Sequence, residues 1–299
     1  MRMITIVNDR PKRNNRGHSH VISGMWKLLV ATLALGAETP LDIMAKAAAN
    51  IESATESRRQ YVYQQKVRSR LLRTNGKVAR QELRLYDIVP GAESTEKKLV
   101  SVEGEFHDGK SLIPYSDPEF RSKKLDIDGE LADQLTGKLV DDSNSRDGIP
   151  KKLFPLRAAE LPYYQFRLIE TKDYKGRPTH HIAFDPIGKP KCDDECHGQW
   201  KGEAWIDAAE YQPVHIATEW AVKVPFVVRT IFGSNLRQSG FAVTYQRLAE
   251  NVWFPVSYGT EFRLDVLFGY KRVITLALES LNFKRTAADT SIQFQLPNE

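Results

Sequence analysis

The stretch Gly202–Trp220, with the sequence GEAWIDAAEYQPVHIATEW, decides the fold of this chain. Its pattern predicts a strand that ends near Ile206, a turn, and a second strand that begins at Pro213. Asp207 is suited to accept hydrogen bonds from the backbone of that turn, and the fixed φ of Pro213 sets the entry to the second strand. A hairpin with a core tryptophan, Trp205, explains all of these residues, so we assign them no catalytic role.

Apolar and polar residues alternate on both sides of this hairpin. In its second strand, Val214 and Ile216 share a face opposite His215 and Glu219. The same period of two predicts strands over 61–72, 77–89, 97–105, 163–171, 179–186, 201–207, 213–224, 240–248, 252–268 and 270–285. One apolar and one polar face in each strand predicts a large antiparallel sheet that must curl, stack or be covered by helices.

The apolar faces of the later strands are candidates for the lining of a ligand groove, or for the core behind such a groove. The sequence leaves both interpretations open. The candidate residues are Trp205, Trp220, Val222, Val224, Phe226, Phe262, Leu264, Val266 and Phe268.

A helix is predicted over residues 39–58, ahead of the strands. Thr39 suits the N-cap, Pro40 suits the first helical position, and Asp42 favours the positive end of the helix. Helical spacing predicts one apolar stripe, formed by Leu41, Met44, Ala45, Ala48 and Ile51. The two strands that follow should form a hairpin, because Asn75 and Gly76 between them are a strong turn signal.

The chain is less regular from about residue 106 to residue 162. Two short helices are predicted there, over 128–140 and over 154–161. A basic stretch, residues 66–84, precedes this region, and its charges alternate with Val, Leu and Ala. This alternation predicts the solvent-facing side of two strands rather than a phosphate-binding track.

Residues 1–37 have the layout of a leader and a secretory signal peptide. Lys27 precedes the apolar run Leu28–Leu35, and the small residues Gly36 and Ala37 follow it. The run is far shorter than the roughly 20 apolar residues of a membrane span. A buried hydrophobic N-terminal helix is the other interpretation of this run. We expect a periplasmic or secreted protein without a transmembrane span in its mature chain.

The basic charge of the chain belongs to this leader, in which Met25 is an alternative start residue. The formal net charge is +5, and the first 37 residues hold six basic residues and one acidic residue. Residues 38–299 therefore carry 37 basic and 37 acidic residues and are neutral, so nucleic-acid binding loses its electrostatic support. We find no linker or repeat in this part and expect it to form a single domain.

Both cysteines of the chain, Cys192 and Cys196, lie just before the hairpin. In an oxidising compartment, a disulfide that closes a tight turn is the simplest interpretation. The alternative is a zinc site in which these cysteines, Asp194 and His197 are joined by His180 or His181. A thioredoxin-like redox site is less favoured, because the Cys-x-x-Cys spacing is missing.

No motif in the sequence indicates catalysis. Nucleophile elbows, zinc-protease helices, phosphate loops and dinucleotide fingerprints do not occur. We therefore expect a protein that is not an enzyme and that needs no cofactor or metal.

The order of these elements resembles that of the LolA-like superfamily of bacterial outer-membrane lipoprotein-sorting proteins. The matching residues are Gly202, Trp205, Ile206, Asp207, Glu210, Tyr211, Pro213 and Val214, followed by the strand entry Asn251–Pro255. The resemblance covers roughly residues 40–285. It implies an α+β, mainly β fold: a curved antiparallel sheet, or unclosed β-barrel, covered by a long N-terminal helix and short helices.

The same resemblance implies a function. Such proteins hold the acyl chains of a lipoprotein in an apolar groove during transit across the periplasm. Arg263 and Tyr258 are candidates for a hydrogen bond to a lipid ester near the mouth of such a barrel. This sequence departs from the family in its length, its cysteine loop and its irregular middle segment. The alternative is an envelope structural or regulatory protein that uses the same fold and acts on membrane partners through its outer surface. A metal-dependent hydrolase centred on the cysteine loop is the third and least favoured interpretation.

Overall fold

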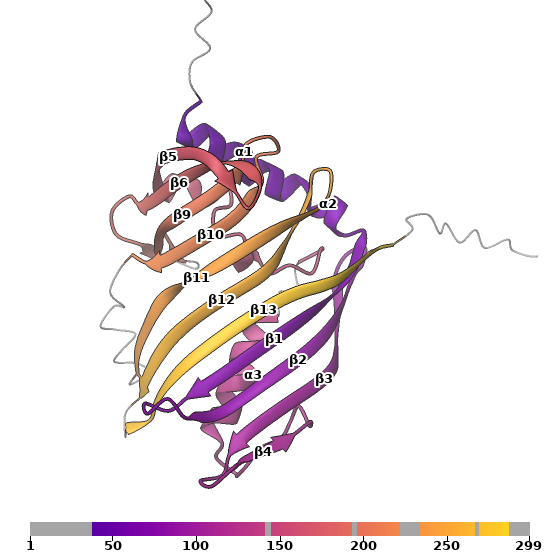
Figure 1. Cartoon of the computed structure of the whole chain (residues 1–299), viewed down its shortest axis with the longest axis vertical. Helices are drawn as coiled ribbons and strands as arrows, with labels where there is room; N and C mark the ends of the chain where they lie inside the picture. The colour runs from indigo at the N-terminus through magenta and orange to yellow at the C-terminus, as the bar shows by residue number, and fades with distance from the viewer. Residues whose placement is uncertain (1–37, 141–144, 193–195, 222–233, 267–268, 287–299) are drawn as a thin grey trace, which may run out of the picture. The chain divides into compact units, whose positions relative to one another are not determined.

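The computed structural model describes residues 38–140, 145–192, 196–221, 234–266 and 269–286. These residues form one large antiparallel sheet, shown in Figure 1, with helices against it. The strands are β1 (Tyr61–Leu72), β2 (Val78–Pro90), β3 (Thr95–His107), β4 (Leu112–Tyr115), β5 (Tyr164–Tyr174), β6 (Arg177–Pro186), β7 (Lys191–Cys192), β8 (Cys196–His197), β9 (Trp200–Asp207), β10 (Pro213–Trp220), β11 (Ser234–Ala249), β12 (Val252–Val266) and β13 (Lys271–Arg285). The helices are α1 (Pro40–Ser53), α2 (Thr55–Arg58) and α3 (Ile127–Val140), with two 3₁₀ turns, η1 (Lys151–Leu153) and η2 (Leu161–Tyr163).

The strand order across the large sheet is β4-β3-β2-β1-β13-β12-β11-β10-β9-β6-β5. Its two end strands, β4 and β5, do not pair with each other, so the sheet is unclosed. The mainly β, antiparallel architecture agrees with the resemblance to the LolA-like superfamily. Each predicted strand is confirmed over the described residues, whereas β4 and the small β7–β8 ladder were not predicted.

β1 and β13, the first and last strands of the large sheet in sequence order, are neighbours in its interior. β1 pairs antiparallel with β13 from Tyr61 opposite Arg285 to Leu72 opposite Val273. β1 also pairs with β2 across the predicted Asn75-Gly76 turn, where Gly76 has a φ of +78°. The pairing of β1 therefore joins the N-terminal hairpin to the C-terminal strands.

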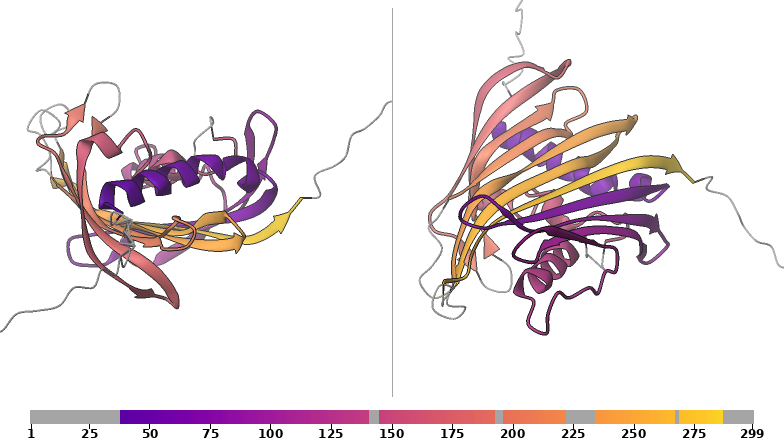
Figure 2. Two further views of the ribbon diagram at one scale, coloured as in Figure 1. Left: turned by 90° about the horizontal axis from the view of Figure 1, so that it is seen from above. Right: turned by 60° about the horizontal axis from the view of Figure 1, so that its bottom comes forward.

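The helices lie against one face of the sheet, which we call the inner face; the opposite face is the outer face. Figure 2 shows α1 and α3 on this same side of the curved sheet. Burial alternates accordingly along β1: Tyr63, Val67 and Leu71 are buried on the inner face, while Arg68 and Arg70 are exposed on the outer face. None of the described helices is long and apolar enough to cross a membrane.

The predicted helix over residues 39–58 is divided into α1 and α2. α1 begins with the predicted cap, in which Thr39 and Asp42 exchange side-chain-to-backbone hydrogen bonds. The predicted apolar stripe is wrong at Leu41 and Ala45, which are exposed. The buried face of α1 instead follows a row of residues four positions apart that starts at Ile43. The buried residues of α1 are Ile43, Met44, Ala47, Ala48 and Ile51.

The helix predicted over residues 154–161 is wrong. Residues 154–160 form turns and irregular backbone between η1 and η2. The segment is too short to be a stable helix by itself. The segment is held instead by the buried side chain of Arg58, whose guanidinium lies 4.9 Å from the centre of the Phe154 ring and binds Asp147 at 2.7 Å.

Asp207 organises the turn of the hairpin that decides the fold. Its carboxylate accepts hydrogen bonds from the N–H groups of Ala209 (3.1 Å) and Glu210 (2.8 Å), as predicted. It also accepts one from Nε of Arg177 at 2.6 Å. The turn is therefore fixed to β6 as well as to its own strands.

Glu210 links this turn to the next hairpin. Its carboxylate accepts hydrogen bonds from Nε1 of Trp253 (2.8 Å) and the N–H of Asn251 (3.2 Å), and it pairs with Nε of Arg247 at 2.6 Å. Asn50 of α1 donates to the carbonyl of Glu210 at 2.8 Å. The turn of the first hairpin therefore supplies the hydrogen-bond acceptor for the Trp253 indole of the next hairpin.

The basic stretch over residues 66–84 was predicted to face solvent, and this is wrong for its second half. Arg80, Glu82 and Arg84 are buried on the inner face. The register is the reason, because Arg80 lies opposite Leu71 and Arg84 lies opposite Val67, both of which point inward.

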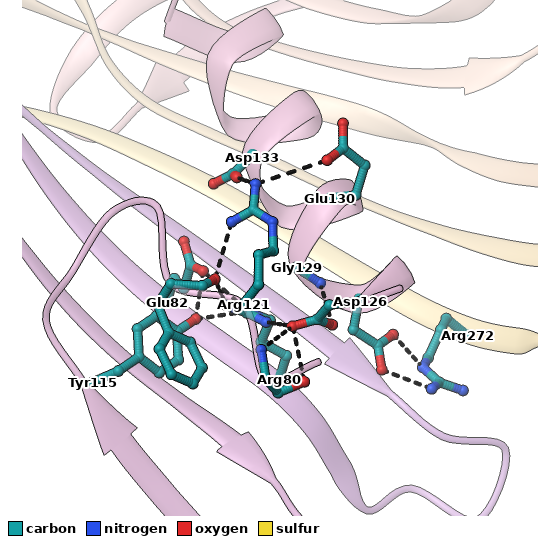
Figure 3. A network of polar contacts seen from close by, with 12 residues as sticks. Arg80, Glu82, Tyr115, Arg121, Asp126, Gly129, Glu130, Asp133 and Arg272 are labelled. Carbon is teal, nitrogen blue, oxygen red and sulfur yellow. Dashed lines mark hydrogen bonds and ion pairs between the residues drawn. The ribbon is translucent and has the colours of Figure 1, made fainter. Parts of the chain in front are cut away.

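α3 covers these buried charges with charges of the opposite sign, as Figure 3 shows. The ion pairs are Arg80 with Asp126 (2.7 Å), Arg84 with Asp133, and Arg272 with Asp128 (2.7 Å). Glu82 lies between Arg80 and Arg84 and pairs with both. α3 is thus attached to the sheet by a charged layer as well as by apolar contacts.

We expect Glu210→Ala to lower the free energy of unfolding by about 2 kcal/mol, because the buried Trp253 indole loses its acceptor. Urea denaturation of the variant and of the unaltered chain measures the difference. Glu219→Ala is the matched control, since the Glu219 side chain is 69% exposed, and should change stability by less than about 0.5 kcal/mol. Equal effects of the two substitutions would contradict the role of Glu210.

We expect the charged layer to make stability depend on acid. Burial disfavours ionised Asp126, but hydrogen bonds from Ser122 and Gly129 and the charge of Arg80 outweigh it, so the pKa of Asp126 lies below its ordinary 3.8. The stabilisation from this carboxylate is complete above that ordinary value and is lost as the pH falls through the lowered pKa. Asp126→Asn should therefore lower the melting temperature clearly at pH 7 and much less at about pH 2. The same loss at both pH values would refute this.

Candidate functional site

A pocket of about 300 Å³ lies on the inner face, at the level of η1 and η2. This volume is at the lower end of the range for small-molecule sites. One wall is formed by aromatic side chains of the sheet: Trp200 of β9, Phe241 of β11 and Tyr258 of β12. The other wall comes from the irregular segment between η1 and η2.

The aromatic wall is closely packed. The rings of Trp200 and Phe241 meet edge to face with centroids 4.8 Å apart, and those of Phe241 and Tyr258 stack at 5.6 Å. Trp220 of β10 extends the wall behind Trp200, edge to face at 4.6 Å. The strand register causes this cluster, because Trp200 lies directly opposite Trp220 on neighbouring strands.

The facing wall is mainly cationic; its acidic residue, Glu160, pairs with His197. Lys151, Lys152 and Arg157 line the pocket from η1 and the turns after it. Nε of Arg157 is buried and has no hydrogen-bond partner among the described residues, and the same is true of Nε1 of Trp220. Two unpartnered donors beside an apolar wall suit a ligand that has both an apolar part and a hydrogen-bond acceptor.

Two phenols at the pocket stay protonated near neutral pH. Burial raises the pKa of Tyr164 to about 12, and it also raises the pKa of Tyr258 to about 12. Each hydroxyl can therefore donate a hydrogen bond to a bound group. Tyr258 was predicted to point toward a bound lipid, and the structure places it at the pocket. Arg263, the other candidate, is exposed on the outer face.

Three of the predicted groove residues share the inner face with the pocket. Trp220 joins the aromatic wall, and Phe262 and Leu264 are half-buried along β12 beyond Tyr258. The side chain of Val266 and the whole of Val222, Val224, Phe226 and Phe268 lie outside the described residues.

Trp205, by contrast, lies on the outer face of β9. Its neighbours Ala204 and Ile206 are buried on the inner face, so alternation directs Trp205 the other way. It stacks on His181 with centroids 4.3 Å apart, and it lies 5.2 Å from the ring of Tyr174. Trp205 therefore does not line the inner-face pocket.

The cysteine segment lies beside the pocket. β7 and β8 pair antiparallel with Cys192 opposite Cys196, and Cys196 contributes to the pocket lining. The disulfide between them stays a prediction. His197 binds Glu160 at 2.9 Å and stacks on Tyr163 at 4.6 Å, so its imidazole is already engaged.

The histidines proposed as extra zinc ligands, His180 and His181, point to opposite faces of β6. His180 lies opposite Ile206 of the inner face, and His181 lies opposite Trp205 of the outer face. In the described part of the chain, no group of three or more His, Cys, Asp or Glu residues is arranged to hold a metal ion.

A larger pocket, of about 740 Å³, lies along β1 to β4. Its lining includes Arg68, Arg70, Glu103 and Glu105, with Tyr115 as its one aromatic residue. Charged side chains of both signs make it less suited to an apolar chain than the aromatic pocket.

Sequence reasoning missed the cationic wall of the pocket and two of its aromatic residues. Phe241 lies in a predicted strand and Trp200 immediately precedes one, so alternation could have placed both on the inner face. Arg157 gave no such signal, because it lies in irregular backbone whose position depends on tertiary contacts.

No protein-family model matches this sequence, and a search of curated proteins found no match. Solved structures do match at low identity. One is a domain from Vibrio parahaemolyticus described as an outer membrane lipoprotein-sorting protein domain: it is 9% identical, the match covers 83% of this chain and 95% of that chain, and the TM-score is 0.33. A DUF1329 family protein from Desulfovibrio piger is 10% identical, with 86% and 97% covered and a TM-score of 0.35. The MucA/MucB complex of Pseudomonas aeruginosa matches at 15% identity, with 82% and 100% covered and a TM-score of 0.23.

We expect the two cysteines to be joined in protein made in an oxidising compartment. Alkylation before and after reduction, followed by mass spectrometry, should show two added groups only after reduction. Replacing Cys192 and Cys196 together by serine should cost roughly 2 kcal/mol or less of unfolding free energy, because the closed loop is short. Two free thiols in the unreduced protein would rule the disulfide out.

Proposed function

We propose that this protein is an exported carrier that binds an amphiphile, either a lipid or the acyl chains of a lipoprotein, in the inner-face pocket. The apolar chain lies against Trp200, Phe241 and Tyr258, and a polar or anionic head group meets the facing cationic wall. The observation that carries the proposal is the unpartnered buried Nε of Arg157 in the lining of an aromatic pocket. The unpartnered Nε1 of Trp220 lies in the aromatic cluster behind Trp200.

The driving force would be burial of apolar surface, which contributes about 25 cal/mol per Å² and about 0.8 kcal/mol for each buried methylene. Arg157 and the neighbouring lysines would add attraction for an acidic head group. This is binding rather than catalysis, and it requires no cofactor or metal.

A periplasmic or secreted location fits this role and rests on the signal-like sequence of residues 1–37. A second function is favoured by the inner face around α1, where Ile43, Met44 and Ile51 belong to a continuous buried core rather than to a groove. In that case the protein would be an envelope structural or regulatory component that contacts its partner through the outer face.

A fatty acid brominated on its chain tests the carrier function, because bromine quenches nearby tryptophan fluorescence. We expect quenching on titration into the full chain, and a clear loss of that quenching in Trp200→Phe. Trp205→Phe is the matched control, since it removes a tryptophan from the outer face of the same strand. Each methylene added to the chain should tighten binding about fourfold until the pocket is full.

The head group is tested in the same assay with a fatty acid and its methyl ester. The acid should bind more tightly, and Arg157→Gln should remove most of that preference. Absence of quenching, or equal losses in the Trp200 and Trp205 variants, would refute binding at this pocket and leave the outer-surface function.

A further inference from the structure

The two edges of the large sheet differ in their protection against pairing with another strand. β4 is short and carries Pro114, which has no N–H to donate to a neighbouring strand. β5 is eleven residues long, contains no proline, and exposes almost every residue between Phe166 and Tyr174. Among the described strands it pairs only with β6. A long exposed edge of this kind is a template for another strand unless its side chains block the approach.

An extra residue in β5 determines which strand fits this edge. Between Leu168 and Glu170, β5 advances two residues while β6 advances one, so Ile169 forms a bulge. The bulge shifts the side-chain alternation by one position. Arg167 before it and Glu170 after it consequently both point to the outer face, where their neighbours in β6 are Ala183 and His181.

We propose that β5 pairs antiparallel with β5 of a second copy of this chain, about a two-fold axis between Leu168 and Ile169. In an unbulged strand this register would set inner-facing residues against outer-facing ones. The bulge removes that conflict, since outer-facing Arg167 then meets outer-facing Glu170, and inner-facing Phe166 meets inner-facing Thr171. The two sheets would continue into one another across the axis.

Charge complementarity favours this register over its neighbour. Because of the two-fold symmetry, the dimer contains two contacts between Arg167 of one copy and Glu170 of the other copy. A shift of the register by two residues would instead bring Arg167 opposite Lys172, and like charges opposite each other are destabilising. The exposed charges of β5 therefore favour this register with a second copy of the same strand.

The contact is small, so the dimer should be reversible. Two strands of this length form about ten backbone hydrogen bonds and bury an area at the low end for specific interfaces. We expect a monomer–dimer equilibrium in the micromolar range. The edge of β5 meets the inner-face pocket at one residue, Tyr164, which begins the strand and lines the pocket.

Sedimentation velocity of the full chain, from about 1 to 200 μM, should show the mass rising from monomer toward dimer. Arg167→Glu and Glu170→Arg, each alone, place like charges together twice and should weaken the dimer at least about tenfold. The double variant R167E/E170R restores opposite charges and should recover most of the affinity.

Mixing the two single variants gives the sharpest test. One copy then carries glutamate at both positions and the other carries arginine at both, so the two should form a heterodimer although neither forms a homodimer. Lys98→Glu is the control: it reverses an exposed charge on β3, near the opposite end of the sheet, and should leave the dimer unchanged.

The results divide cleanly. A wild-type protein that stays monomeric at 200 μM would overturn the proposal, as would a dimer that is insensitive to both single reversals. Recovery in the double variant together with heterodimer formation on mixing would establish it. Circular dichroism of each variant checks that the exposed substitutions leave the fold intact.

Discussion

The pairing of β1 with β13 is the constraint on which the rest of the structure depends. It brings Tyr61 opposite Arg285 and Leu72 opposite Val273, residues that are separated by most of the chain. Without it the N-terminal hairpin, with β3 and β4, would be a small sheet of its own, and α3 would have no surface of sufficient width to cover. Because closing so long a loop has an entropic cost that only the completed sheet offsets, we expect this pairing to form late in folding.

The two halves of the sheet are covered in different ways. Under α1 the inner face is apolar, and the turn around Asp207 and Glu210 fixes α1 to β9, β10 and the next hairpin through Asn50 and Trp253. Under α3 the inner face carries arginines, which form ion pairs with aspartates in α3 and just before it. The apolar half cannot be loosened without exposing its core, whereas the charged half can exchange ion pairs for water at a smaller cost. The aromatic pocket lies on the apolar half, where the irregular segment replaces regular helix.

The proposed ligand site and the proposed dimer contact use the inner-face pocket and the edge of β5, which share only Tyr164. The pocket joins an aromatic wall, made by regular strands, to a cationic wall, made by turns that Arg58 and Tyr245 hold in place. The edge presents its charges in a pattern that matches itself only because of one bulge residue, Ile169. The proposed dimer would therefore hold two copies of the pocket.

The sequence by itself determined the strands, the N-cap of α1, the first hairpin and the role of Asp207 in its turn, because alternation, capping and turn chemistry are local. It also placed Trp220, Phe262 and Leu264 on the correct face. Only the tertiary structure decided that β1 lies beside β13, that Arg80 and Arg84 are buried, and that Trp205 faces outward. These features depend on strand register and on what covers each face of the sheet. The local sequence pattern is the same for an arginine that faces water and for an arginine that is buried in an ion pair with an aspartate of α3.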